Sequence, residues 1–257
     1  MIERVTHKLI QSGDIIEIYE YSEGYLKGYK LTEREIKNRI YSERSSAGAD
    51  STDSRERSLK RAKMNLRRLI NANVGQYGKD VTAKFLTLTF KENIQDIKQA
   101  NYEFKKFIKR LNYKVYGTKK AILKYTTVIE FQKRGAIHYH TILYNMPYIK
   151  ANEIAEIWDN GFIKINKIDD IDNVGAYIGE YLGQAEKEQG KEVEDERLRG
   201  QKTHFSSRGL YKPNEITDKK IVEQIAAALP NEKLTYTATF ENEHIGNITY
   251  KQYNIKD

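Results

Sequence analysis

The N-terminal part of the chain has a pattern typical of β-structure. Over residues 14–30, apolar Ile16 and Ile18 alternate with polar neighbours such as Glu17, and Gly24 interrupts the run. Alternation with a period of two places apolar side chains on one face of a strand. Because a glycine between two such runs is typical of a turn, the pattern predicts a β-hairpin over these residues.

Helical patterns follow. Thr32 and Glu35 have the spacing of a capping box and predict a helix start, whereas the small polar residues 45–54 predict a loop. Residues 55–73 have apolar positions at helical spacing, and over 55–68 they include seven basic residues and one acidic residue. Two interpretations of this basic helix stay open: a solvated face, or a surface that follows nucleic-acid phosphates.

The central region alternates between strand and helix patterns. In chain order we predict a strand at 85–90, a helix from Asn93 to about Asn112, strands at 122–132 and 136–144, a helix at 151–159, a strand at 162–165, and a helix from Asp169 or Asp172 through Tyr181. This order predicts an α+β fold: a central four- or five-stranded antiparallel sheet with helices on one face, and with the other face open to a ligand.

The remaining patterns complete a three-part organisation. The acidic stretch 186–196 predicts an exposed loop, residues 215–229 a helix, and residues 234–240 with 245–253 a terminal hairpin. We therefore expect an N-terminal hairpin and basic helical region over 1–80, a core domain over 81–212, and a C-terminal helix and hairpin over 213–257.

Composition limits the class of protein. The chain has 257 residues, a net charge of +8 and no cysteine, which excludes a disulfide scaffold, a thiolate nucleophile and a cysteine-ligated zinc site. Its mean hydropathy is −0.74, and the sequence contains neither a membrane-length apolar run nor a signal-peptide pattern. We expect a soluble intracellular protein with phosphate-rich partners.

The hairpin around residues 133–135 brings three potential metal ligands together. His138 and His140 project from the same face of their predicted strand. A three-residue loop ending in Gly135 pairs Glu130 with His138 on that face, whereas a two-residue loop turns Glu130 to the opposite face. Two imidazoles and a carboxylate suit Mn²⁺, Mg²⁺, Zn²⁺ or Fe²⁺. The alternative is a pair of surface histidines beside an unrelated acid.

A second constellation lies on the helix that ends near residue 181. Tyr177 and Tyr181 are four residues apart, so they share one helix face one turn apart. The chain contains 19 tyrosines, and an aromatic pair at this spacing is commonly a packing contact. Packing and chemistry are both open for this pair on the residues alone.

Three motifs occur in order along the chain. They are the strand 85–90 (FLTLTF), the run from Glu130 to His140, and Ala176 with Tyr177 and Tyr181. Together they resemble the motifs of the rolling-circle replication initiators, or HUH endonucleases, of bacterial phages and plasmids. The likeness is to the two-tyrosine type and covers roughly residues 60–212. Those proteins usually carry a lysine three residues after each tyrosine, where this chain has Glu180 and Gln184.

The resemblance implies a fold and an activity. The core would be an RRM-like or ferredoxin-like HUH domain that nicks and joins single-stranded DNA through a 5′-phosphotyrosine intermediate. Glu130, His138 and His140 would hold Mn²⁺ or Mg²⁺, and Tyr177 and Tyr181 would be the nucleophiles. The implied partners are single-stranded or supercoiled origin DNA and a host helicase, with no membrane, in the cytoplasm of a bacterial host cell.

Basic and aromatic side chains would contact the DNA. The expected DNA-binding residues are Arg134, Tyr139, Arg61, Arg68, Lys105 and Lys109. One alternative is a non-catalytic module that binds single-stranded nucleic acid on an RRM-like sheet. A second alternative, a non-haem iron oxygenase, shares the ligand set but is disfavoured by the long helices and the tyrosine pair.

Overall fold

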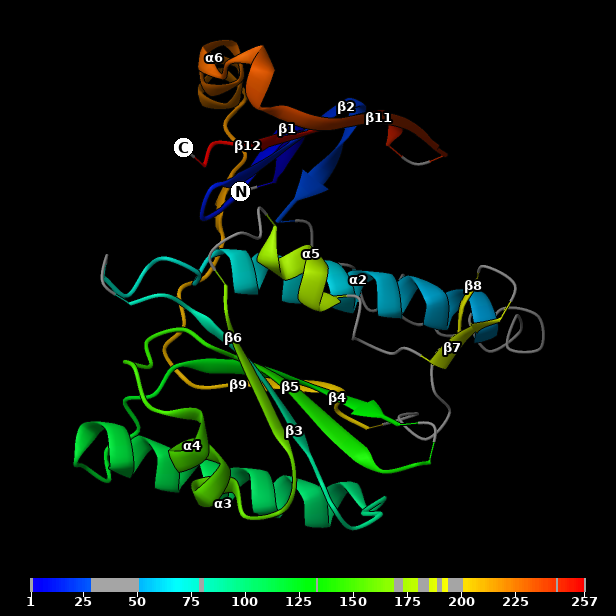
Figure 1. The fold of residues 1–257 in the computed structure, drawn as a ribbon. Helices are drawn as coiled ribbons and strands as arrows, with labels where there is room; N and C mark the ends of the chain where they lie inside the picture. The colour runs from blue at the N-terminus through cyan, green and yellow to red at the C-terminus, as the bar shows by residue number, and fades with distance from the viewer. Residues whose placement is uncertain are drawn as a thin grey trace. The chain divides into compact units, whose positions relative to one another are not determined.

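The computed structural model describes residues 2–28, 51–78, 81–132, 134–168, 173–179, 185–188, 191–193, 201–243 and 245–256 (Figure 1). The chain divides into two compact units, Lys63–Lys212 and the combination of Met1–Ala62 with Pro213–Asp257. Each unit contains one five-stranded antiparallel sheet with helices, which confirms the predicted α+β class. The predicted capping box at Thr32 and Glu35 lies outside the described residues.

The sheet of the unit Lys63–Lys212 has the strand order β6-β3-β5-β4-β9. Its strands are β3 (Lys84–Thr89), β4 (Tyr125–Phe131), β5 (Ile137–Leu143), β6 (Ile163–Lys167) and β9 (His204–Ser206). The first four were predicted from their apolar and β-branched runs, and the structure confirms them with small shifts at the ends. All their pairings are antiparallel.

Two helices pack on one face of this sheet, α3 (Ile97–Tyr116) and α4 (Ala151–Trp158) (Figure 1). The side chains of Phe104 and Phe107 from α3 and Trp158 from α4 are fully buried against the inward side chains of the strands. Helix α3 begins later than predicted because Asp96, and not Asn93, is its N-cap: the Asp96 carboxylate accepts the Gln99 N–H at 2.7 Å.

The opposite face of the sheet is not wholly open, in contrast to the prediction. The short helix α5 (Val174–Gly179) lies over it, beside the end of α2 (Ser51–Asn71) (Figure 1). Helix α2 confirms the predicted basic helix and begins four residues earlier, within the stretch expected to be a loop. The predicted helix through Tyr181 is described only as far as Gly179.

The second unit combines both ends of the chain. Its sheet has the order β10-β1-β2-β12-β11, formed by β1 (Glu3–Ser12), β2 (Ile15–Lys27), β10 (Asn214–Ile216), β11 (Leu234–Asn242) and β12 (Gly246–Asn254). A 3-10 turn (Asn231–Lys233) and α6 (Lys219–Ala228) precede the terminal hairpin, which was predicted correctly. The two terminal regions, expected to be separate, share one sheet because β12 pairs with β2.

Three local predictions need correction. The N-terminal hairpin turns at Gly13, and Gly24 lies inside the continuous strand β2, opposite a register shift between Val5 and His7. The predicted helix 215–229 is preceded by strand β10, because Asp218 caps α6 by accepting the Ile221 N–H. In place of part of the acidic loop, β7 (Ala185–Glu188) pairs with β8 (Lys191–Val193). No helix in the described ranges is long and apolar enough to cross a membrane.

Candidate metal centre and tyrosine helix

The β4–β5 hairpin has the register that the candidate metal site requires. Gln132 N–H donates to the Ala136 carbonyl at 2.8 Å, and Gly135 N–H donates to the Gln132 carbonyl at 2.7 Å. Gly135 has φ of 89°, in the left-handed region that glycine favours. As a result Glu130 pairs directly with His138, and the predicted three-residue loop is confirmed.

The three predicted ligands converge on one face. One ligand atom each from Glu130, His138 and His140 lies within 4.8 Å of the other two. His140 Nε2 lies 2.5 Å from Glu130 Oε2, and its Nδ1 is 3.3 Å from the Thr87 hydroxyl on β3. The Thr87 contact orients the His140 ring from the far side, as the supporting shell of a metal ligand commonly does.

His138 supplies the observation that tests whether a cation fits here. Its Nε2 is buried and has no hydrogen-bond partner among the described residues. Burial, the neighbouring His140 and Arg134 lower the pKa of His138 to about 4, and the Glu130 charge only partly opposes them. The imidazole is therefore neutral at neutral pH, with a lone pair available to a cation. A nitrogen, a nitrogen and a carboxylate oxygen fit a divalent metal.

An aromatic stack connects this centre to α5. The rings of Phe85 and His140 lie nearly parallel with their centroids 5.7 Å apart. The Tyr177 ring meets Phe85 edge-on at 5.9 Å. Tyr177 is 39% exposed, so a molecule bound over the triad can reach it. Tyr181, Glu180 and Gln184 lie outside the described residues.

Helix α5 is held in place by an asparagine that the sequence analysis did not single out. Asn71, at the end of α2, accepts the Gly175 N–H at 2.8 Å and donates to Asn173 Oδ1 at 2.9 Å. Asn173 Oδ1 also accepts the Ala176 N–H at 3.0 Å. A Cβ on Gly175 would lie 2.2 Å from the Arg67 carbonyl oxygen, so only glycine allows this approach. The glycine was a detectable signal, whereas Asn71 is too distant in sequence to be recognised.

Two of the predicted DNA-binding residues are used inside the unit. Tyr139 is fully buried between the sheet and α3, with its ring stacked on Phe104 at 4.6 Å and its hydroxyl donating to Asn101. The expected base-stacking role of Tyr139 is therefore wrong. Arg134 is exposed, but its guanidinium donates to the carbonyls of Phe90 and Lys91, where it supports the hairpin loop.

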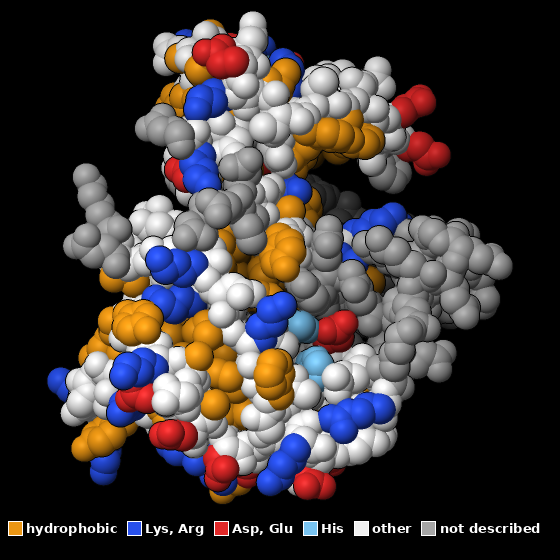
Figure 2. All heavy atoms as spheres, in the orientation of Figure 1, with side chains coloured by type: hydrophobic (Ala, Val, Ile, Leu, Met, Phe, Trp, Pro, Cys, Tyr) orange, Lys and Arg blue, Asp and Glu red, His pale blue; other side chains and the backbone are white. Residues whose placement is uncertain are grey.

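The other predicted DNA-binding residues are distributed over both faces of the sheet. Lys105 and Lys109 are exposed on α3, on the side opposite the triad. Arg61 is exposed and Arg68 is half-buried on α2. In the face shown in Figure 2, histidine side chains reach the surface next to an acidic side chain and are flanked by basic ones. Positive charge is therefore available near a carboxylate–histidine site.

Comparison with known proteins gives one match. Residues 83–186 match the sequence model of a family described as the ORF2 type of replication-associated protein. The matched segment contains β3 to β6, the triad and α5. Searches of curated proteins and of solved structures gave no significant match.

Proposed function

We propose that this protein initiates rolling-circle replication by nicking and rejoining single-stranded DNA at an origin. The observation that carries the proposal is the convergence of Glu130, His138 and His140 below a helix that bears Tyr177. Support comes from the match of this same segment to the replication-associated family. Tyr177 and Tyr181 are the proposed nucleophiles, and the three ligands would hold Mn²⁺ or Mg²⁺.

The proposed reaction is a transesterification. The Tyr177 phenol oxygen attacks a backbone phosphorus, the bond from phosphorus to the 3′-oxygen breaks, and the phenol proton passes to solvent as the released 3′-oxygen gains one. A divalent cation, when bound, would offset the charge that gathers on the phosphate oxygens. The 5′-phosphotyrosine conserves the energy of the diester, so rejoining needs no ATP. Tyr181, one turn further along, would allow a second cleavage while Tyr177 holds the first strand.

The chain's own residues provide the positioning in this scheme. Phe85 supports the Tyr177 ring edge-on and keeps it above the His140 imidazole. Asn71 fixes the start of α5 by two hydrogen bonds. Holding the phenol in place beforehand lowers the entropic part of the barrier, which is the main contribution that a protein makes to such a step.

The experiment is a covalent-adduct assay. The protein is mixed with Mn²⁺ and a pool of single-stranded oligonucleotides of random sequence labelled at the 3′ end, because a 5′-phosphotyrosine retains the 3′ fragment. A denaturing gel should show labelled protein for the wild type and none for the double variant Tyr177→Phe, Tyr181→Phe. Tyr148→Phe, which removes the hydroxyl of an 83% exposed tyrosine elsewhere, should retain the adduct. An adduct that persists in the double variant refutes the nucleophile assignment.

The same assay separates the proposal from a non-catalytic nucleic-acid-binding module. His138→Ala should abolish Mn²⁺ binding in calorimetry and abolish the adduct together, since it removes a ligand that has no other partner among the described residues. A protein that binds the oligonucleotides but forms no adduct with Mn²⁺ or Mg²⁺ would instead support the binding module.

A further inference from the structure

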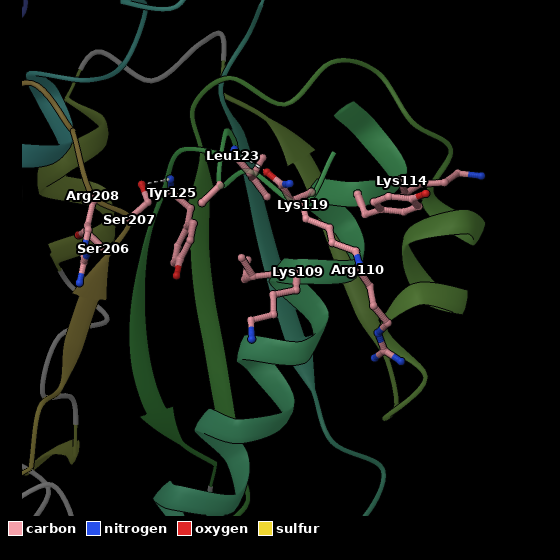
Figure 3. Close-up of a pocket in the computed structure, with 13 residues that line it drawn as sticks. Lys109, Arg110, Lys114, Lys119, Leu123, Tyr125, Ser206, Ser207 and Arg208 are labelled. Atoms are coloured by element: carbon pink, nitrogen blue, oxygen red, sulfur yellow. Dashed lines mark hydrogen bonds between the residues drawn. The ribbon is translucent and has the colours of Figure 1, made fainter. Parts of the chain in front are cut away.

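A large groove lies on the sheet face away from the triad, between the C-terminal half of α3 and strands β4 and β9. Its volume is about 1210 Å³. Pockets for small ligands commonly have about 300–1,000 Å³, so this groove has room for an extended ligand. Figure 3 shows Lys109 from α3 and Tyr125 from β4 directed into the space between them, with Ser206, Ser207 and Arg208 on the opposite wall.

The groove combines an apolar floor with a cationic rim. Ile108, Leu123 and the ring of Tyr125 form apolar parts of the lining. Five basic side chains line it, and none of the described lining residues is acidic. Lys114 is paired with Glu153 at 2.7 Å, and the Arg110 guanidinium approaches the Trp158 carbonyl. The charge offered to a ligand therefore comes mainly from Lys109, Lys119 and Arg208.

This chemistry matches unpaired nucleic acid better than other polyanions. Cations along a rim follow phosphates, and an apolar, aromatic floor accepts the faces of bases. Double-stranded DNA would keep its bases inside and leave the floor unused. An acidic peptide would satisfy the cations, but it would place carboxylates against the apolar floor at a desolvation cost.

The groove is distinct from the candidate metal centre. Strand β4 contributes to both, with Tyr125 on the groove face and Glu130 beside the histidines. Five residues of strand separate these two positions, or roughly 17 Å along the strand. Strand β9 is the sheet edge between the two faces, and its His204 pairs with Val128.

We propose that this groove is a second binding site for single-stranded DNA, which holds the strand on the face opposite the nicking centre. The inference extends the proposed function by giving the substrate strand a second point of attachment around the β9 edge. Such an attachment would keep the cut strand on the protein without adding a group to the chemistry.

The test measures binding in the presence of EDTA, so that no metal-dependent step contributes. A fluorescent oligo-dT of about 25 nucleotides, longer than the roughly 4–16 nucleotides that one single-strand site covers, is titrated with protein and followed by anisotropy. The groove variant is Lys109→Glu with Arg208→Glu. The control is Lys98→Glu with Lys150→Glu, which changes the net charge equally at exposed residues that do not line the groove.

The groove variant should bind about tenfold more weakly than the control variant. Its plot of log affinity against log salt should be shallower by about 1.4, or about 0.7 for each of two lost phosphate contacts. Photo-crosslinking of the wild type with an oligonucleotide that contains 5-iododeoxyuridine should label the peptide with Tyr125. Circular dichroism of both variants should match the wild type.

Several results would overturn the site. Equal weakening in both variants would show only general attraction to positive charge, and wild-type affinity in the groove variant would remove the site altogether. Tighter binding of a polyglutamate peptide, with displacement of the oligonucleotide, would assign the groove to an acidic protein partner. The failure of this proposal leaves the adduct assay unaffected, since the groove variant retains the triad and both tyrosines.

Discussion

Replacing Asn71 by alanine should loosen α5 without touching a metal ligand. The Asn71 amide makes two hydrogen bonds to the start of this helix, one from the Gly175 N–H at 2.8 Å and one to Asn173 Oδ1 at 2.9 Å. Alanine removes both partners and leaves the Gly175 N–H buried. Since α5 carries Tyr177, the change acts on the proposed nucleophile through the backbone that supports it.

The expected magnitude follows from the two bonds. A buried donor left unsatisfied costs about 1–3 kcal/mol, and the loss of an ordinary side-chain hydrogen bond costs about 0.5–1.5 kcal/mol. The docking of α5 should therefore weaken by about 2 kcal/mol or more, which is roughly 30-fold in its equilibrium. Asn71→Asp keeps the acceptor for Gly175 and loses the donor to Asn173, so it should have an intermediate effect.

Two assays check the Asn71 prediction. Hydrogen exchange should show faster exchange of the amides of Gly175 and Ala176 in the alanine variant, independently of any function. The rate of adduct formation should fall in parallel, while Mn²⁺ affinity in calorimetry stays unchanged because Glu130, His138 and His140 lie on other strands. Unchanged exchange at these amides, or a loss of Mn²⁺ affinity as large as the loss of adduct, would refute the reasoning.

Two further predictions concern stability. Gly161→Ala should lower the free energy of unfolding by roughly 2 kcal/mol or more, because its Cβ would lie 2.4 Å from the Thr89 carbonyl oxygen and 2.5 Å from the Lys91 nitrogen; Gly117→Ala, with nothing within 4 Å, should cost only about 1 kcal/mol in urea unfolding. Burial, with a smaller effect of a nearby lysine charge, lowers the pKa of His204, so the stability it contributes is present above pH 6.5 and is lost as the pH falls. The urea midpoint should drop on acidification from pH 7.5 to 5.5, and less so in His204→Gln; an equal drop in both proteins would contradict this assignment.

The candidate metal site was predictable because its determinants are local. A single loop, residues 133–135, sets the register between β4 and β5, and the period of two along a strand then fixes which side chains share a face. The same rule contained the correction for Tyr139. If His138 and His140 face the site, the residue between them must face the helices, where Tyr139 is found fully buried.

The errors arose where a residue's conformation depends on a distant part of the chain. Gly24 has the positive φ of a turn residue, 72°, yet it lies in β2 opposite a register shift in β1. A Cβ at this position would lie 2.7 Å from the Val5 carbonyl oxygen, so the glycine serves a close approach between strands. Sequence spacing around Gly24 gives the same signal for both cases. The pairing of β12 with β2 is equally remote, and no local pattern predicts it.

The two parts of the proposed active site therefore depend on different contacts. The ligands are positioned by one hairpin, so a one-residue change in its loop would turn Glu130 away from the histidines. The tyrosine helix is positioned by Asn71 and by the absence of a side chain at Gly175, from segments about a hundred residues apart. Damage to the first should abolish metal binding, whereas damage to the second should leave metal binding intact and slow only attack by the phenol. Separate readouts of metal affinity and adduct rate distinguish the two, because each responds to only one set of contacts.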